Sequence, residues 1–252
     1  MNRVIDLNCD LGETHPTLPH NHDAEIMPFI TSCNIACGYH AGSEDQLHKT
    51  VDLAIAHNVA IGAHPSYDDW DNFGRVSVDV PIDKLREQIT EQVNLAKTIT
   101  ESKGGTLHHV KPHGALYHDM ASDLTFATAI IEAIKQVDPS LIIYGLARSE
   151  MATACANLKL RFFAEAFSDR AYDSLTKLRP RSLEGAVITD KTGVIDQVEL
   201  LLTQNIKTYN GKIYSTKINT ICLHSDTKGA AALAANIHHY INTTDVDFYQ
   251  AM

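Results

Sequence analysis

The stretch HHVKPHGALYHD, residues 108–119, gathers side chains capable of acid–base chemistry around one proline–glycine corner. Lys111 and His113 stand two residues apart, so they point to the same side of an extended backbone. A lysine among apolar groups can stabilise negative charge on an oxygen, and a histidine can transfer protons near neutral pH. We therefore predict that Lys111 and His113 are catalytic and that Tyr117, in the same stretch, contacts the substrate.

A purely structural role for this lysine is also open. Lys111 can form an ion pair with an inward-facing carboxylate such as Asp6, because buried lysines are normally paired. We expect His108, His109 and His118 at the surface or behind the reacting groups.

Acidic and amide side chains alternate with apolar ones in IDLNCDLGE, residues 5–13. In a strand this alternation puts Asp6, Asn8 and Asp10 on one face and the apolar residues on the other. A row of polar groups is costly if buried without partners, so this face should point toward a site. We predict that Asp10 is catalytic and that Asn8 contacts the substrate. Anchoring of a loop or a helix end is the alternative for Asp6 and Asp10.

Two histidines follow the next two apolar runs, His40 in CGYHAGSED and His64 in GAHPSY. A lone histidine at such a position is more often structural. Two histidines at equivalent strand ends, beside Asp10 on a neighbouring strand, resemble a His/His/Asp set for a divalent metal. A divalent metal on these three residues is therefore a hypothesis, although no local His-Glu-x-x-His motif supports it.

The later runs add further charged residues. In AEAFSDRAYD, Asp169 shares the parity of Glu165 and Phe167, and we predict that Asp169 is catalytic. An arginine can bind a carboxylate or phosphate through two hydrogen bonds, whereas a surface ion pair explains any single arginine equally well. The remaining predicted substrate contacts are Arg170, Arg181, His224 and Asp226.

Seven short apolar runs would position these residues. They are residues 3–9, 32–37, 59–64, 106–111, 141–147, 160–166 and 219–224. Segments with a 3.6-residue apolar period separate them, which predicts an α/β fold of parallel strands joined by right-handed crossovers. Either a closed or nearly closed barrel or an open doubly wound sheet could result. In both folds functional residues lie at the carboxyl ends of the strands, and only YGLARSE is less clearly polar there.

The segment after residue 111 carries specific boundary signals. Pro112 and Gly114 are expected to turn the chain. Ser122 is expected to cap a helix that ends before Asp138 and Pro139.

The composition is that of an ordinary globular protein, with 44% hydrophobic and 21% charged residues among 252. We expect a single domain covering residues 1–252. The net charge of −10, without a Lys/Arg cluster, argues against nucleic acid as a partner, and no run approaches the roughly 20 apolar residues of a membrane span. An odd number of cysteines, five, and an N-terminus without an apolar leader favour reduced thiols and a cytoplasmic location.

Longer motifs in the chain resemble those of the LamB/YcsF family. They occur in that family's order from about residue 4 to residue 240: IDLNCDLGE, NIACGYHAG, AIGAHPSY, NFGR, VKPHGALY, EAFSDRAY, LRPRS, GAVI and CLHSD. Ser43 and Ser225 depart from the resemblance, because aspartate and glycine are more usual there. The loop from His15 to Asp23 is also atypical.

The resemblance implies a seven-stranded parallel β/α barrel, TIM-like and of the glycoside hydrolase/deacetylase type. It also implies ATP-dependent opening of 5-oxo-L-proline to L-glutamate, with ATP as co-substrate, performed together with 5-oxoprolinase subunits B and C. Two other functions stay open: a stand-alone metal-dependent amide or N-acetyl hydrolase, and a non-catalytic substrate-binding subunit. The missing G-x-x-x-x-G-K-[ST] loop favours the hydrolase, and the many ionisable strand ends argue against the binding subunit.

Overall fold

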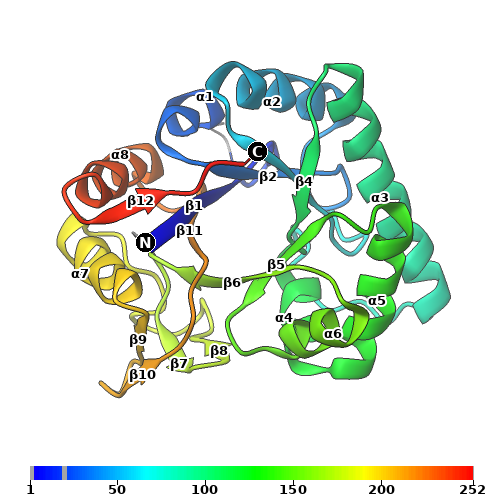
Figure 1. The fold of residues 1–252 in the computed structure, drawn as a ribbon. Coiled ribbons are helices and arrows are strands. Elements are labelled where there is room, and N and C mark those ends of the chain that lie inside the picture. The colour runs from blue at the N-terminus through cyan, green and yellow to red at the C-terminus, as the bar shows by residue number, and fades with distance from the viewer. Residues whose placement is uncertain (1–2, 19–21, 252) are drawn as a thin grey trace.

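Seven parallel strands close into a barrel in the computed structural model, which describes residues 3–18 and 22–251 (Figure 1). β1 pairs with β2 on one side and with β11 on the other, so the ring is complete. This closure confirms the barrel and excludes the open doubly wound sheet. The barrel strands, in ring order, are β1 (Arg3–Leu11), β2 (Ser32–Ala36), β3 (Ala60–His64), β4 (Leu107–Val110), β5 (Ile142–Leu146), β6 (Phe162–Phe167) and β11 (Thr220–His224).

Helices form the layer outside the barrel (Figure 1). They bury apolar stripes against outward-facing strand residues such as Ile5, Leu7 and Leu11, which are 0–2% exposed. The helices are α1 (Asp23–Ile26), the 3₁₀ helix η1 (Met27–Phe29), α2 (Glu44–His57), α3 (Ile82–Ser102), α4 (Gly114–Ser122), α5 (Leu124–Val137), α6 (Glu150–Leu158), α7 (Lys191–Leu202) and α8 (Ala230–Ile241). Part of the predicted polar loop from His15 to Asp23, residues 19–21, lies outside the described residues.

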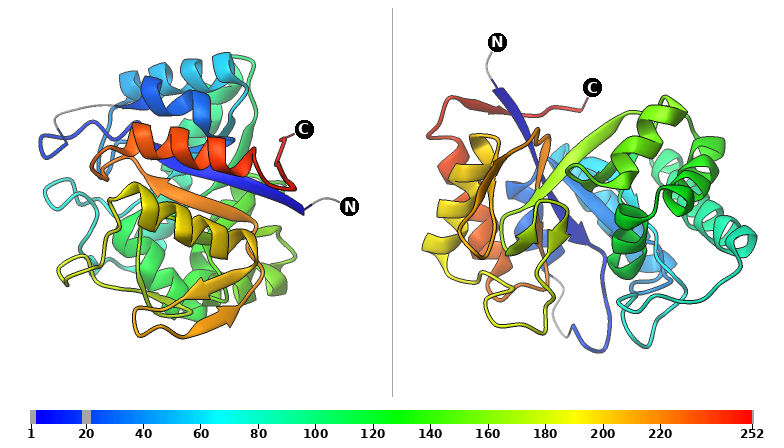
Figure 2. Two further views of the ribbon diagram at one scale, coloured as in Figure 1. Left: turned by 90° about the vertical axis from the view of Figure 1, so that its left-hand side faces the viewer. Right: turned by 90° about the horizontal axis from the view of Figure 1, so that it is seen from below.

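Short additional strands accompany the barrel without a signal in the apolar pattern. β12 (Val246–Phe248) pairs in parallel with the first residues of β1, and both ends of the chain lie at this end of the barrel (Figure 2). Two hairpins lie outside the ring. They are β7 (Tyr172–Ser174) with β8 (Lys177–Leu178), and β9 (Asn205–Lys207) with β10 (Ile213–Ser215). Strands this short contain too few residues to show a period of two.

The segment after β4 differs from the prediction. Gly114 has a φ of +53°, a value that favours glycine, and α4 begins there instead of following a turn. α5 is a separate helix, and its N-cap is Asp123, which accepts a hydrogen bond from Phe126 N at 2.9 Å. The prediction that Ser122 caps this helix is therefore wrong. Its hydroxyl donates to carbonyls in the last turn of α4, which leaves the capping position to the next residue.

The barrel interior is polar along β1. Asp6, Asn8 and Asp10 are all buried inside the ring, as the alternation predicted. Asp6 lies near the amino end of the ring and accepts hydrogen bonds from three hydroxyl groups at 2.5–2.8 Å. These hydroxyls belong to Thr31, Ser32 and Thr220. Asp6 is therefore a structural anchor.

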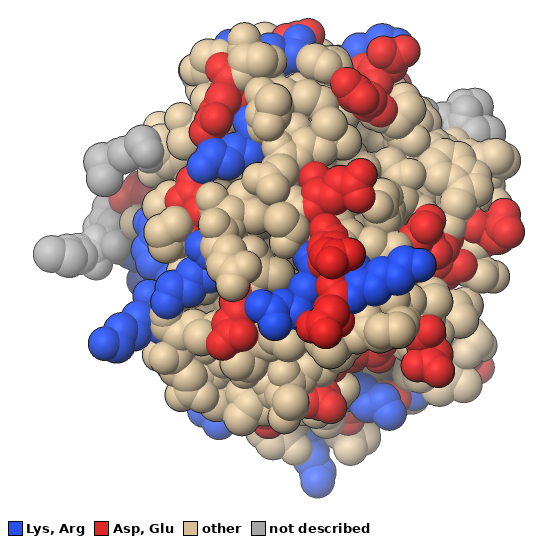
Figure 3. All heavy atoms as spheres, turned by 90° about the vertical axis from the view of Figure 1, so that its right-hand side faces the viewer, with Lys and Arg blue, Asp and Glu red and all other residues tan. Residues whose placement is uncertain are grey.

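Charges of both signs share the outer surface. Figure 3 shows Lys and Arg interspersed with Asp and Glu on the face that α3 and α5 cover, where Lys97 lies 2.6 Å from Asp138. No helix among the described residues is long and apolar enough to cross a membrane. All five cysteines are buried free thiols, in agreement with the prediction from their odd number.

Candidate active site

A cavity of about 870 Å³ opens at the carboxyl ends of the barrel strands. Residues at the ends of β1, β3, β4, β5, β6 and β11 line it, so most of the predicted site residues converge. The end of β5 contributes as well, because Arg148 and Glu150 line the cavity. Arg148 has a φ of +61°, uncommon for a residue with a side chain, at the point where β5 gives way to α6.

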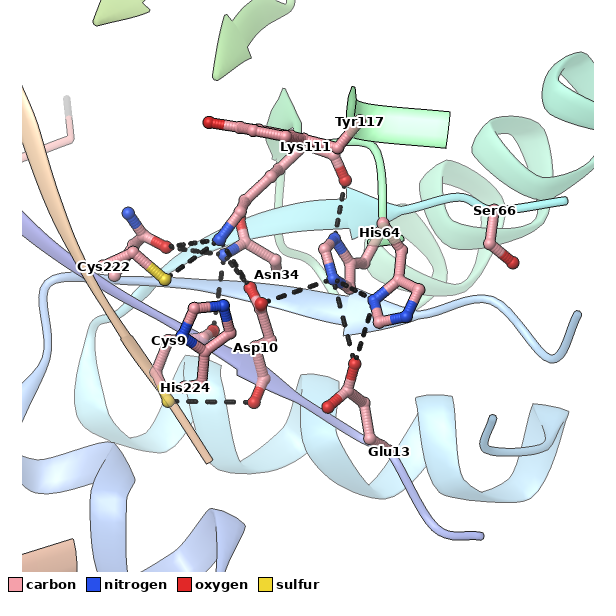
Figure 4. A network of polar contacts seen from close by, with 12 residues as sticks. Cys9, Asp10, Glu13, Asn34, His64, Ser66, Lys111, Tyr117, Cys222 and His224 are labelled. Atoms are coloured by element: carbon pink, nitrogen blue, oxygen red, sulfur yellow. Dashed lines mark hydrogen bonds and ion pairs between the residues drawn. The ribbon is translucent and has the colours of Figure 1, made fainter. Parts of the chain in front are cut away.

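Lys111 is the charged centre of this cavity. Its Nζ atom lies 2.8 Å from Asp10 Oδ1 and 2.9 Å from Glu165 Oε1 (Figure 4). Asn8 Oδ1 at 3.3 Å and Cys222 Sγ at 3.0 Å complete its surroundings. The ammonium has three donors for these four acceptors. An oxygen of a ligand can therefore reach Lys111 by displacing the weakest acceptor, the sulfur.

Electrostatics fix the charge states of this pair. Burial alone would lower the pKa of Lys111, but the charge of Asp10, followed by Cys222 and Glu165, raises that pKa well above its usual value. Burial would raise the pKa of Asp10, but His64 and Lys111 hold it well below its usual range. Lys111 is therefore protonated and Asp10 ionised at neutral pH. The partner of Lys111 is thus Asp10 together with Glu165, and not Asp6.

Asn8 and Tyr117 support this centre from different positions. Asn8 donates to Glu165 Oε1 at 3.0 Å and to Thr220 Oγ1 at 2.7 Å, and it does not line the cavity. Tyr117 lines the cavity and donates its hydroxyl to Glu165 Oε2 at 2.8 Å. Of these two predicted substrate contacts, only Tyr117 can be reached from the cavity.

Four buried residues form a compact cluster beside Asp10. Glu13, His40, His64 and His113 each offer one possible ligand atom, and these atoms all lie within 4.8 Å of one another. Glu13 Oε1 is 3.2 Å from His40 Nε2 and 3.3 Å from His113 Nδ1. Asp10 Oδ2 lies outside this set, 3.5 Å from His64 Nε2. The structure thus joins the predicted pair His40 and His64 to Glu13 and His113, with Asp10 as a neighbour.

Hydrogen bonds behind each ring determine which nitrogen is free. His64 Nδ1 donates to a backbone carbonyl at 2.6 Å, and His113 Nε2 donates to another at 2.9 Å. His40 Nδ1 lies 3.0 Å from Ser66 Oγ, whose own proton goes to a carbonyl, so this ring nitrogen is also a donor. The remaining nitrogen of each ring therefore directs its lone pair into the cluster (Figure 4).

The lone pairs and the carboxylate repel one another unless a cation lies among them. A proton on His64 is one solution, because burial would lower its pKa but the charge of Asp10 raises it. A divalent metal is the other. Burial lowers the pKa of His40 to about 3, which keeps this ring neutral as a metal ligand must be. Neutral imidazoles whose outer N–H groups are bound elsewhere, together with a carboxylate, are a donor set suited to zinc and similar metals. The cluster therefore fits a divalent metal.

His224 and Asp169 form a second pair at the cavity. His224 Nδ1 lies 3.0 Å from Asp169 Oδ1, which leaves Nε2 as the free nitrogen. Asp169 is fully buried, accepts a hydrogen bond from Thr227 at 2.5 Å and does not line the cavity. Burial would raise the pKa of Asp169, but the charge of His224 outweighs it and lowers that pKa. Of these two residues, His224 is therefore the one placed to exchange a proton with a ligand.

Arginines at the rim of the cavity are held by protein groups. Asp226 lies 2.5 Å from Arg75 and 3.3 Å from Arg181, and these pairs link the loops that follow β3, β8 and β11. Arg170, only 5% exposed, donates to two backbone carbonyls. Both predicted substrate-binding arginines line the cavity, but each already has a partner that a substrate carboxylate would have to share or replace.

Three residues of this site were not predicted from the sequence. Glu13 follows Gly12, whose φ of +71° interrupts the strand alternation, so parity could not place it. Glu165 could have been found, because it shares the parity of Asp169. Arg75 belongs to a long loop without periodicity. A charged residue directly after a strand-end glycine was the available signal for Glu13.

Known proteins resemble this chain over nearly its whole length. Residues 5–252 match the LamB/YcsF family. The chain belongs to the LamB/YcsF family. One LamB/YcsF relative, named as the A subunit of 5-oxoprolinase, from Bacillus cereus (strain Q1), is 38% identical over 245 residues, covering 96% of this chain and 97% of its own. Another of that name, from Bordetella pertussis (strain Tohama I), is 39% identical over 238 residues, covering 94% of each chain.

A solved structure shares the LamB/YcsF fold. The crystal structure called Lactam Utilization Protein, from Thermus thermophilus, matches with a TM-score of 0.90 and 32% identity, covering 98% of this chain and 100% of that one. These comparisons confirm the LamB/YcsF family and the TIM-like barrel that the motifs predicted. Ser43, where the family more often has aspartate, still accepts a hydrogen bond from Gln46 N and caps α2.

Proposed function

We propose that this LamB/YcsF chain is the A subunit of an ATP-dependent 5-oxoprolinase. In this role it opens 5-oxo-L-proline to L-glutamate, with hydrolysis of ATP, together with the B and C subunits. The names of relatives, the A subunit of 5-oxoprolinase at 38–40% identity and a lactam utilization protein at 32%, support this substrate class. The observation that carries the proposal is the position of Lys111 between Asp10 and Glu165, at a cavity that also borders the Glu13–histidine cluster.

A lactam needs activation before it opens. Its C–N bond has partial double-bond character, and a five-membered ring favours the closed form, so coupling to ATP supplies the driving force. In the proposed route the lactam oxygen attacks the γ-phosphoryl group of ATP and releases ADP. Water then adds to the activated carbon, the C–N bond breaks, and phosphate and glutamate leave. The cavity suits the second step, because it contains a cation and proton acceptors.

Each residue has a proposed task in that step. Lys111 stabilises negative charge on the oxygen of the reacting carbon, and Asp10 positions the water. His224, oriented by Asp169, exchanges a proton with the ring nitrogen as the C–N bond breaks. Arg181 or Arg170 binds the substrate carboxylate through its planar donors.

The cluster of Glu13, His40, His64 and His113 would hold a divalent metal beside these groups. Such a metal acts as a Lewis acid and makes bound water more acidic. His113, which we predicted as an acid–base residue, contributes through this cluster, because its free nitrogen faces His64 at 3.0 Å.

The decisive experiment for this function uses purified subunits. The chain is incubated with ATP and 5-oxoproline, with and without the B and C subunits, and glutamate and phosphate are measured. We expect glutamate only from the complete mixture. Equal glutamate formation by B and C alone would show that this chain is not required.

The metal-type cluster favours a second candidate, a stand-alone amide or N-acetyl hydrolase. This enzyme would act without ATP and without partner subunits, and a chelator would abolish its activity. Release of amine and acid from simple amides or N-acetyl compounds by the isolated chain would favour it over the first function.

A further inference from the structure

Two consecutive histidines that the proposed reaction does not use lie below the cavity. His109 is fully buried inside the barrel and does not line the cavity, and His108 is half-buried. The strand register explains this arrangement. Ile61 pairs with Leu107 and Gly62 with His109, so His108 is an extra residue in the ladder between β3 and β4. The irregularity brings the Nδ1 atoms of the two rings within 3.1 Å.

Gly62 makes room for the His109 ring. A Cβ atom at Gly62 would collide with the imidazole at Nε2. Glycine in the interior of a strand is unfavourable by itself and often marks the close approach of another group. On another side the ring stacks on Tyr144, with centroids 4.0 Å apart and planes 15° apart. The barrel is therefore shaped around this imidazole.

Asn34 connects His109 to Asp10. The Asn34 amide donates through Nδ2 to Asp10 Oδ1 and to Asn8 Oδ1, each at 2.8 Å. Its Oδ1 atom is then the acceptor for His109 Nε2, at 2.8 Å. In the reversed orientation the amide oxygen would face the ionised Asp10 carboxylate. The N–H of His109 thus selects the orientation that binds Asp10.

The remaining proton positions follow from this amide. Because His109 Nε2 is the donor, Nδ1 of the neutral ring accepts from His108 Nδ1. His108 Nε2 then accepts from the Tyr249 hydroxyl at 3.0 Å. Burial lowers the pKa of both histidines, that of His108 to about 4, so both rings are neutral near pH 7. Every donor from Tyr249 to Asn34 therefore points toward Asp10, and hydrogen bonds aligned in this way strengthen one another.

We propose that His109 is a positioning residue for the reaction at Asp10. Its Nε2–H group fixes the Asn34 amide, which holds Asp10 Oδ1 next to Lys111 and leaves Oδ2 beside His64. The inference rests on the proposed role of Asp10 in lactam opening. The hydrogen-bond directions that it requires can nevertheless be measured without any activity.

Ring ¹⁵N chemical shifts report which nitrogen of a histidine carries the proton. We expect His109 to be the neutral Nε2–H tautomer and His108 the neutral Nδ1–H tautomer at pH 7. Signals are assigned with the variants His108→Gln and His109→Gln. An Nδ1–H tautomer or an imidazolium at His109 overturns the proposal, whether or not the protein opens lactams.

Steady-state kinetics of the three-subunit mixture test the consequence. His109→Phe keeps a ring against Tyr144 but removes the donor, and we expect kcat to fall about 10–100-fold with KM changed less than about threefold. His109→Gln keeps a donor near the Nε2 position and should recover most of this loss. If Gln is as slow as Phe while urea unfolding shows equal stability, His109 does not act through its donor.

A double variant separates positioning from simple support of the fold. Asn34→Ala removes the group through which His109 is proposed to act. We expect His109→Phe to lower kcat in the wild-type background but hardly at all in the Asn34→Ala background. Additive losses would contradict the proposal. Absence of glutamate formation by the wild-type mixture would instead refute the proposed function, and the tautomers would still decide the inference.

Discussion

His64 Nε2 and His113 Nδ1 face each other at 3.0 Å, and each ring donates its other nitrogen to a backbone carbonyl. Two lone pairs at this distance are stable only with a proton or a metal between or beside them. The Glu13 carboxylate adds negative charge at the same place. Burial would raise the pKa of Glu13, but hydrogen bonds from His113 and His40 hold it well below its usual range. The cluster is thus arranged to bind a cation.

Metal analysis should therefore find about one divalent ion per chain after dialysis against a mixture of zinc, manganese and nickel. His64→Ala removes one of the converging nitrogens, and we expect it to weaken metal binding at least about 100-fold. His57→Ala is the matched control, because His57 is exposed at the end of α2. Equal metal content in both variants would mean that the cluster holds a proton instead.

Lys111→Met should affect stability and activity separately. The substitution leaves Asp10 and Glu165 buried without their cation, so we expect the free energy of unfolding to fall by about 3–5 kcal/mol. Glu165→Gln in the same chain removes one of the unpaired charges and should restore part of this stability. Activity should stay lost in the double variant. Urea unfolding and glutamate formation provide the two readings, and recovery of both together would assign Lys111 to the fold alone.

Arg181→Met should weaken binding of 5-oxoproline about 10–100-fold, because one charged hydrogen bond to a carboxylate is lost. The lactam 2-pyrrolidinone has the same ring without the carboxylate, so its binding should not change. Calorimetry with the isolated chain measures both ligands, and Lys84→Met, an exposed change outside the cavity, is the control. Equal weakening of both lactams would indicate that Arg181 acts only by holding Asp226.

Stability should depend on pH through His108. Burial and the charge of Arg161 lower its pKa to about 4, from an ordinary value of 6.5. Below pH 6.5 the unfolded chain binds a proton that the folded chain does not, so this contribution is present above 6.5 and is lost as the pH falls toward 4. In His108→Gln, the free energy of unfolding should therefore fall less steeply over that range. Parallel urea-unfolding profiles for the variant and the wild type would contradict this reading.

Strand parity predicted a large part of the site. Alternation placed Asn8 and Asp10 inside the barrel, and the spacing after β4 placed Lys111 and His113 at its carboxyl end. This worked because the period of two is a local property of the backbone. The partner of Lys111 could not be read in the same way. Asp6 and Asp10 have equal parity, and the choice depends on the stagger between β1 and β4, which are not adjacent in the ring.

Local irregularities hid the other residues. Glu13 lies beyond a glycine in the left-handed region, where alternation no longer applies. His109 was expected at the surface or behind the reacting groups, and its full burial inside the ring depends on the register between β3 and β4 and on the space over Gly62. The order of the two helices after β4 turned on whether Ser122 or Asp123 is the cap, and both residues favour that position.

The rate of glutamate formation by the mixture of this chain with the B and C subunits, with Lys111→Met compared against the wild type, tests the site most directly. If the cavity at the carboxyl ends of the strands opens the lactam, the variant should be at least about 100-fold slower, because a charge-stabilising donor is gone. A folded Lys111→Met chain that supports the wild-type rate would place the chemistry elsewhere.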